Sequence, residues 1–148
     1  MPIIPVQSGE DEQRLDLLLW EVLWQPLGFP RDVRDSFGIE GEQIVFAARE
    51  EEKMTGGLVA VMTSPSDIEL RHIAVRPEAR NRGTGGRLVG ALVEEASRRG
   101  CRRLLVVSRN TSAGFFRKLA FQPAPVAAPE HPDFSMHGIA FIIMEKAV

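Results

Sequence analysis

Several features that mark other protein classes are missing from this sequence of 148 residues. Its single cysteine, Cys101, excludes an internal disulfide. No apolar run approaches the ~20 residues that a membrane-spanning helix needs. The first residues lack the basic start and the long apolar stretch of a secretory signal. We therefore expect a cytoplasmic protein that does not enter a membrane.

Repeats, low-complexity tracts and linkers are also absent, so the chain predicts one domain over residues 1–148. Domains commonly hold ~100–200 residues. Hydrophobic residues make up 44% and charged residues 26% of the sequence, which is ordinary globular composition.

Charge is distributed unevenly along the chain, although the net charge is only −2. The segment from Arg71 to Lys118 contains twelve Lys or Arg and three Asp or Glu, a balance of +9. The remainder contains six basic and seventeen acidic residues, a balance of −11. We expect the basic segment to contact a small anion. Few aromatic side chains accompany it and the whole protein is acidic, so we expect no nucleic-acid partner.

Hydrophobic periodicity predicts an α/β fold with a mixed sheet flanked by helices. Helices are expected over 11–24, 85–99 and from 111 or 112 to 119, and strands over 43–49, 57–62, 68–75, 103–107 and 139–144. The first three strands form an antiparallel meander. The fourth follows through a helix, so it should lie parallel to the third by a crossover.

The turn between the third strand and its helix reads Arg80-Asn81-Arg82-Gly83-Thr84-Gly85-Gly86. Glycines let the backbone turn sharply and approach a ligand. Amides in the first turn of a helix point outward at the positive end of its dipole, and together these features cradle a pyrophosphate. A P-loop would need Lys and Ser or Thr after Gly86, where Arg87 and Leu88 stand. A dinucleotide-binding turn would need a third glycine at the position of Leu88, so the sequence matches neither pattern.

Two motifs give the chain a resemblance to a known family. The segment LRHIAVRPEARNRGTGGRLVGAL, from Leu70 to Leu92, resembles the GNAT N-acetyltransferase signature, Gln/Arg-x-x-Gly-x-Gly/Ala after a strand that ends apolar-Ala-Val-x-Pro. The segment NTSAGFFRKLAF, from Asn110 to Phe121, resembles the family's Asn-x-x-Ala-x-x-Phe-Tyr-x-x-x-Gly-Phe. Both lie in the family's order with a strand between them. The resemblance covers about residues 44–121.

The resemblance implies acetyl-CoA as co-substrate, no metal, and transfer of the acetyl group to a primary amine of a small molecule or peptide by direct attack in a ternary complex. The pantetheine arm would contact the strand backbone at Ile73, Ala74 and Val75, the side chain of Asn110, and a wall of Ala113, Phe115 and Phe116. The pyrophosphate would bind the amides of Arg80, Asn81, Arg82, Gly83, Thr84, Gly85 and Gly86, and Lys118 would reach the adenosine 3′-phosphate. The family also leaves a homodimer open.

Glu69 is the expected general base, because several family members carry their base six residues before the position of Val75. A free glutamate carboxyl has a pKa of ~4.3, so burial would be needed for it to act near neutral pH. The alternative is that Glu69 is a surface partner of Arg71 or Arg49. His72 is the second candidate, since histidine titrates near neutrality. In a regular strand it faces away from Glu69, and only a bulge would bring both into one site.

The sequence contains no tyrosine, and this bears on the proton that the CoA thiolate must receive. Many family members place a tyrosine at the position of Phe116. Ser108, Ser112 or water would have to replace it here. Without a replacement, the chain would be an acyl-CoA-binding sensor or partner module with little or no transferase activity. An unrelated nucleotide-binding protein is the third reading.

Other candidate residues carry weaker signals. Trp20, Trp24 and Phe29 either line an acceptor pocket or pack in the core. His131, Asp133 and His137 fit no standard zinc spacing, so no metal is expected, and their loop either contacts the acceptor or is only a connection. The acidic surroundings favour a cationic acceptor.

Overall fold

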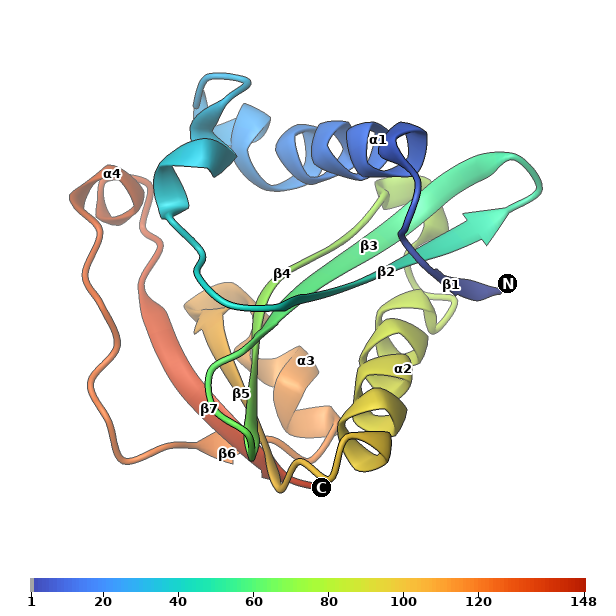
Figure 1. Ribbon diagram of the computed structural model, residues 1–148. Helices are drawn as coiled ribbons and strands as arrows, with labels where there is room; N and C mark the ends of the chain where they lie inside the picture. The colour runs from blue at the N-terminus through green and yellow to red at the C-terminus, as the bar shows by residue number, and fades with distance from the viewer. Residues whose placement is uncertain (1) are drawn as a thin grey trace.

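The computed structural model describes residues 2–148 and contains a seven-stranded sheet with helices on both faces (Figure 1). The strand order across the sheet is β1-β2-β3-β4-β5-β7-β6. Only β4 and β5 pair in parallel; the other five pairs in the described chain are antiparallel. The predicted meander followed by a parallel crossover is therefore confirmed.

The strands are β1 Ile3–Pro5, β2 Gln43–Glu50, β3 Lys53–Met62, β4 Asp67–Val75, β5 Arg103–Arg109, β6 Gln122–Pro123 and β7 Phe141–Ala147. The α-helices are α1 Gly9–Leu19, α2 Thr84–Arg98, α3 Ala113–Lys118 and α4 Pro132–Ser135. Short 3-10 helices cover Gln25–Leu27, Val33–Phe37, Pro77–Ala79 and Asn110–Ser112, and a π-helix covers Trp20–Trp24. The predicted elements are all present with shifted ends. Three short elements were missed, β1, β6 and α4, because two to four residues are too few to show a period.

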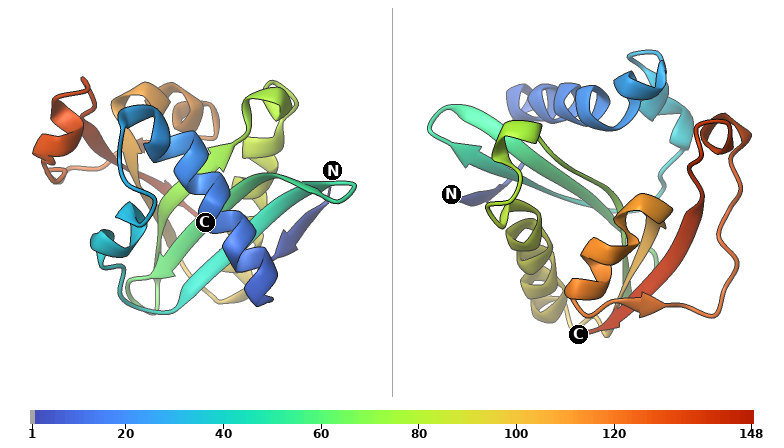
Figure 2. Two further views of the ribbon diagram at one scale, coloured as in Figure 1. Left: turned by 90° about the horizontal axis from the view of Figure 1, so that it is seen from above. Right: turned by 180° about the vertical axis from the view of Figure 1, so that it is seen from behind.

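Helices cover both faces of the sheet, α1 on one face and α2 and α3 on the other, as the two views of Figure 2 show. Leu15 of α1 packs directly over Gly57 of β3, since a Cβ added at Gly57 would lie 2.1 Å from Leu15 Cδ1 and would force that side chain to move. On the opposite face, Leu88 and Leu92 of α2 are fully buried together with Phe116 of α3. Among residues 2–148, no helix combines the length and apolarity needed to cross a membrane.

The helix predicted over 11–24 is two different helices in the structure. It begins as α1 with Ser8 as its N-cap, where Ser8 Oγ accepts a hydrogen bond from the Asp11 amide at 3.1 Å. After Leu19 it widens into the π-helix at Trp20–Trp24. Such π-turns interrupt the regular hydrogen-bond ladder and are frequent at functional sites. The last carbonyls of a helix lack partners within it, which leaves the Leu23 carbonyl available for a distant donor.

A β-bulge makes β4 irregular. Val59 of β3 pairs with His72 of β4, but the next residue, Ala60, pairs with Leu70, so Arg71 is an extra residue. Leu70 belongs to the core on the α2 face, whereas His72 packs against aromatic rings on the α1 face. The extra residue restores Glu69 and His72 to one face of the sheet. The regular strand assumed from the sequence, with the two on opposite faces, is therefore wrong.

The parallel pair β4–β5 is hydrogen-bonded only over its first half, from Asp67–Arg103 to Leu70–Val106. Beyond that point β4 stays with β3 and β5 stays with β7. The two strands diverge toward their carboxyl ends, as Figure 1 shows. The gap between residues 71–75 of β4 and 107–109 of β5 positions the candidate site.

Candidate active site

Two cavities meet at the gap between β4 and β5. The larger, about 620 Å³, runs along β4 to the turn before α2 and is called the turn cavity. The smaller, about 130 Å³, lies between β4, β5, the π-helix and α4 and is called the aromatic cavity. Leu23, Ile73, Arg109 and Ser112 line both, so the two cavities adjoin each other at the gap.

The turn that closes one end of the turn cavity has a defined backbone. Asn81 and Gly83 adopt left-handed conformations, with φ of 64° and 79°, and Gly83 is the N-cap of α2. Arg80 Nε donates to the Val75 carbonyl at 3.1 Å, and Thr84 Oγ1 donates to the Ala79 carbonyl at 3.3 Å. The amides of the first turn of α2 have no acceptor within the helix. This combination suits a phosphate group.

Gly85 is the glycine of this turn that packs most closely against another element. A Cβ added there would lie 3.0 Å from two ring atoms of Phe115 in α3. Phe115 is 36% exposed and lines the turn cavity. The start of α2 and the ring of Phe115 therefore form closely facing walls, and a side chain at position 85 would push against the ring.

The backbone of β4 offers hydrogen-bonding groups to the gap. The amide of Arg76 donates to Thr55 of β3 at 2.8 Å, while the Val75 carbonyl accepts from Arg80 instead of from β3. Main-chain groups alternate in direction along a strand. The amide and carbonyl groups of Ile73 and Val75 consequently point away from β3 and into the gap, where an extended ligand could pair with the two Ile73 groups and the Val75 amide.

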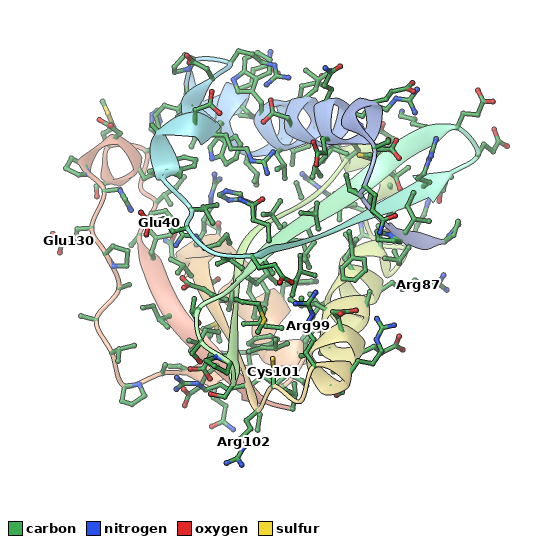
Figure 3. The ribbon with its side chains drawn as sticks, viewed as in Figure 1. Glu40, Arg87, Arg99, Cys101, Arg102 and Glu130 are labelled. Atoms are coloured by element: carbon green, nitrogen blue, oxygen red, sulfur yellow. The ribbon has the colours of Figure 1, made fainter. Side chains whose placement is uncertain are left out.

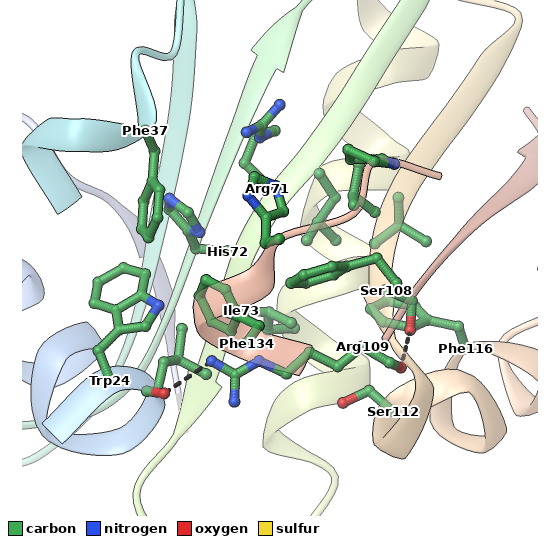
Figure 4. A pocket seen from close by; sticks show the side chains of 17 residues that line it. Trp24, Phe37, Arg71, His72, Ile73, Ser108, Arg109, Ser112, Phe116 and Phe134 are labelled. Atoms are coloured by element: carbon green, nitrogen blue, oxygen red, sulfur yellow. Dashed lines mark hydrogen bonds between the residues drawn. The ribbon is translucent and has the colours of Figure 1, made fainter. Parts of the chain in front are cut away.

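Five aromatic rings contribute to the wall of the aromatic cavity: Trp24, Phe37, Phe116, Phe134 and Phe141 (Figure 4). Its polar lining consists of Arg71, His72, Ser108, Arg109, Ser112 and His131. No Asp or Glu is among the described residues that line it. The cavity thus combines an apolar interior with positive charge.

His72 is buried in this wall, with 8% of its surface exposed. Its ring meets the Trp24 ring edge-on at 5.1 Å and lies 5.7 Å from the Phe37 ring. The pKa of His72 is lowered from 6.5 to about 3, mainly by burial and also by the positive charges of Arg34, Arg71 and Arg109, while a hydrogen bond to the Arg71 backbone acts in the opposite direction. The imidazole is therefore neutral at pH 7.

The Nε2 atom of His72 is the one buried side-chain nitrogen or oxygen without a hydrogen-bond partner in residues 2–148. The backbone hydrogen bond to Arg71 then involves the other ring nitrogen, Nδ1, which we assign as the protonated one. Nε2 carries the lone pair, and a buried acceptor without a donor is costly. An N–H or O–H group of a bound ligand would supply the hydrogen bond that Nε2 lacks.

Arg109 crosses the junction of the two cavities. Its Nη2 donates to the Leu23 carbonyl of the π-helix at 2.8 Å, and its guanidinium lies 5.6 Å from the centre of the Phe134 ring (Figure 4). Burial lowers the pKa of Arg109. In the described part of the chain, no carboxylate forms an ion pair with it. By contrast, Arg71 pairs with Glu69 at 3.4 Å.

The model of the acetyltransferase (GNAT) family matches residues 10–121 of this sequence. The chain belongs to the GNAT acetyltransferase family. Its splayed strands and phosphate-type turn are thus features of an acetyltransferase fold.

Solved structures of this family share the fold across almost the whole chain. One is an aminoglycoside 6′-N-acetyltransferase complexed with coenzyme A, with 19% identity, 99% of this chain and 97% of that chain covered, and a TM-score of 0.78. Another is the ribosomal-protein-S18-alanine N-acetyltransferase from Escherichia coli, with 19% identity, 99% and 93% covered, and a TM-score of 0.78. A third is a GNAT family acetyltransferase from Elizabethkingia anophelis with acetyl-CoA bound, with 18% identity, 99% and 97% covered, and a TM-score of 0.69.

Most of the residues predicted to bind the cofactor lie together. Those that line the turn cavity are Ile73, Ala74, Val75, Arg80, Asn81, Gly83, Thr84, Gly85, Gly86 and Phe115. Phe116 lies at the aromatic cavity instead. Their contact with a cofactor stays a prediction.

Four of the predicted cofactor residues line neither cavity. Arg82 forms an ion pair with Glu50, at 3.2 Å. The Asn110 side chain donates to the Gly138 carbonyl at 3.4 Å and accepts from the Ala140 amide at 3.2 Å, which ties the end of β5 to the start of β7. Ala113 is buried in the core, and Lys118 is exposed.

The two candidate bases differ in position. His72 lines the aromatic cavity, whereas Glu69 is not among the residues lining either cavity and its carboxylate pairs with Arg71. The serines differ as well. Ser108 Oγ already donates to the Arg109 carbonyl at 2.8 Å, while the Ser112 hydroxyl forms no hydrogen bond within the described chain and lies at the junction.

Some of the weaker candidate residues line the aromatic cavity, and others pack behind its wall. Trp24 and His131 line the aromatic cavity. Trp20 supports it from outside, because its Nε1 donates to the Phe29 carbonyl at 3.0 Å and the Phe29 ring packs 5.0 Å from that of Phe134. No group of three or more His, Cys, Asp or Glu side chains in residues 2–148 is placed to hold a metal ion.

Sequence reasoning missed Leu23 and Arg109, which line both cavities. Leu23 falls on the apolar face of the helix predicted over 11–24, but its role here depends on its carbonyl. Arg109 was counted only as part of a basic segment. Arg109 follows the predicted buried strand, at the carboxyl end where ligands bind between parallel strands. This position was the sequence signal for a role in the site.

Proposed function

We propose that the protein transfers an acetyl group from acetyl-CoA to a primary amine by direct attack in a ternary complex. The observation that carries the proposal is the β4–β5 gap, which joins a phosphate-type turn to a cavity large enough for a small acceptor. An elongated cofactor anchored at the turn would run along β4 and present its thioester at the junction. Structures of the same fold with coenzyme A or acetyl-CoA bound support this choice of cofactor.

The cofactor would be bound largely by the backbone. Its pyrophosphate would accept hydrogen bonds from amides between Arg80 and Gly86 at the start of α2, with the side chain of Arg80 adding positive charge. The two amide groups of its pantetheine arm would pair with the outward main-chain groups of Ile73 and Val75, as an added strand does. Phe115 would cover the arm from α3.

The reaction then needs one bond formed, one broken and one proton moved. The amine nitrogen attacks the thioester carbonyl carbon, the carbon–sulfur bond breaks, and the acetyl group becomes an amide. The amine proton ends on the departing CoA sulfur or in solvent. The Ile73 amide, which points into the gap, is our candidate donor to the oxygen that becomes negative during attack.

For the proton-handling groups we assign His72 and Ser112. The free lone pair on His72 Nε2 would accept a hydrogen bond from the neutral amine and orient it for attack, and Glu69 would act from outside the cavity by positioning Arg71. Ser112, whose hydroxyl forms no hydrogen bond within the described chain and lies at the junction, would donate a proton to the CoA thiolate. Many family members use a tyrosine at the position of Phe116 for this step, and phenylalanine has no hydroxyl group.

A pair of glycine substitutions in α2 tests cofactor binding. Gly85→Ala would push a methyl group against Phe115 and narrow the turn cavity, so the rise in Tm on adding acetyl-CoA should shrink. Gly90→Ala is the control, because nothing lies within 4 Å of its added Cβ. Equal Tm shifts in both variants would contradict the placement of the cofactor. Release of free CoA across a panel of amines tests the transfer itself.

Phe116 supports one alternative function, an acyl-CoA-binding module without transferase activity. It occupies the position of the family's acid and has no hydroxyl group. This alternative predicts a Tm shift with acetyl-CoA but no CoA release above background with any amine. Turnover that depends on Ser112 would refute it.

A further inference from the structure

The lining of the aromatic cavity is at odds with a polycationic acceptor. Acidic residues outnumber basic ones over the chain, but none of the described residues lining this cavity is acidic; of its two arginines, Arg71 pairs with Glu69 outside the cavity, and Arg109 pairs with no carboxylate of the described chain. A second positive charge on the acceptor would find no counter-ion there. The excess of carboxylates lies elsewhere on the protein, for example in the Glu10–Glu12 region that starts α1.

Arg109 supplies a positive charge that the described chain leaves without an ion-pair partner. Burying such a charge is unfavourable unless it is compensated. The Leu23 carbonyl and the face of the Phe134 ring compensate it only in part. A guanidinium carries five N–H donors in a planar fork that matches a carboxylate, and one bond to Leu23 leaves donors for such a ligand.

The rest of the cavity selects a small apolar body. Its volume of about 130 Å³ is close to that of a protein cavity of ~150 Å³ that holds a single benzene molecule. Phe37, Phe134 and Phe141 offer ring edges and faces to such a group. One ring or branched aliphatic group fits, and a multi-ring acceptor does not.

We propose, building on the acetyltransferase activity above, that the acceptor is a small α-amino acid with an aromatic or branched apolar side chain. Its carboxylate pairs with the guanidinium of Arg109, its side chain lies among the rings of the aromatic cavity, and its amine donates to His72 Nε2. This arrangement gives the Nε2 atom of His72 a hydrogen-bond donor and gives the guanidinium of Arg109 a counter-ion. The amine nitrogen is then next to the junction where the thioester would lie.

Matched acceptors test the carboxylate without altering the protein. The first pair is L-phenylalanine and L-phenylalaninamide, which differ only in replacing the carboxylate by a neutral amide. A charge-assisted contact predicts that kcat/KM for the acid exceeds that for the amide by about 10- to 100-fold. The comparison is stringent, because the amide has the lower amine pKa and so more free base at neutral pH.

Two further acceptors identify the chemistry of the anion. The phosphonate analogue of phenylalanine tests a phosphate-type group on the same skeleton, and 1,4-diaminobutane tests a second cation. Faster turnover of the phosphonate than of the acid would overturn the assignment to a carboxylate. A preference for the diamine or for the phenylalaninamide would overturn the inference altogether while leaving the acetyltransferase activity intact.

Variants locate the anion site. Arg109→Gln should abolish the preference for the acid over the amide, and Arg109→Lys should retain part of it. Arg103→Gln is the matched control, because Arg103 pairs with Asp67 and Glu145 at the other end of β5 and should leave both kcat/KM values unchanged. If Arg109→Gln does not fold, the ratio of kcat/KM for the acid to that for the amide in the wild type still tests the carboxylate contact. Arg71→Gln then serves as the second variant, and it should reduce this ratio less than the loss of Arg109 would.

Failure of transfer and failure of the inference have different signatures. If acetyl-CoA raises the Tm but no amine is acetylated, the proposed transferase activity is wrong. The inference is then decided by calorimetry on the CoA complex, where L-phenylalanine should bind at least about 10-fold more tightly than its amide. Equal affinities would overturn it.

Discussion

Replacing the buried His72 is expected to remove much of the acid sensitivity of this fold. The pKa of His72 is lowered from 6.5 to about 3 in the folded protein, so the unfolded chain takes up a proton first as the pH falls. The stability contributed by the neutral imidazole is complete above the unfolded pKa. It is lost progressively as the pH falls from 6.5 toward about 3.

The magnitude follows from the two pKa values. Each pH unit inside this window costs about 1.4 kcal/mol of unfolding free energy, and the whole window costs about 5 kcal/mol. Between about pH 7 and about pH 5 the loss should be about 2 kcal/mol. Protonation of carboxylates adds little to the change in unfolding free energy within this interval. The pKa values of Glu78 and Glu95 are lowered in the folded protein, so the stability that these groups contribute is lost at more acid pH.

The assay is urea unfolding of wild type, His72→Phe and His137→Gln at both pH values. Phenylalanine should fit between Trp24 and Phe37 and removes an unpaired buried nitrogen, so the variant should be as stable as wild type at neutral pH, or about 1 kcal/mol more stable. Its stability should change little between the two pH values. His137 is exposed, and its variant should keep the full wild-type loss. An equal loss in His72→Phe would refute the reasoning.

Three other substitutions probe the site and the fold. Ser112→Ala should lower kcat by about 10-fold or more, as loss of a general acid does, without altering the Tm shift with acetyl-CoA, and an unchanged kcat would exclude Ser112 as the proton donor. Glu69→Gln should lower kcat/KM much less than His72→Phe; the reverse order in the same CoA-release assay would make Glu69 the base. Ala120 adopts φ of 70°, so Ala120→Gly should raise the stability by about 1 kcal/mol in urea unfolding, and a loss of stability would show that its side chain compensates for the strain.

Local patterns predicted much of the framework. The turn from Arg80 to Gly86 depends on left-handed backbone at Asn81 and Gly83 and on the helix that follows, and all of these are encoded by neighbouring residues. The main strands and α2 follow from hydrophobic period. The crossover between β4 and β5 follows from chain length and handedness, because a helix separates two strands of one sheet. Such features need no information from distant parts of the chain.

Only the tertiary structure decided what the site contains. The bulge at Arg71 arises from the pairing of β4 with β3, and it places Glu69 and His72 on one face, contrary to simple alternation. The contact between Arg109 and the Leu23 carbonyl joins residues 86 positions apart. The overall negative charge of the sequence suggested a cationic acceptor, yet the aromatic cavity has a positive lining. Composition counts every charge equally, whereas the field inside a cavity depends on the few side chains that folding turns inward and removes from water.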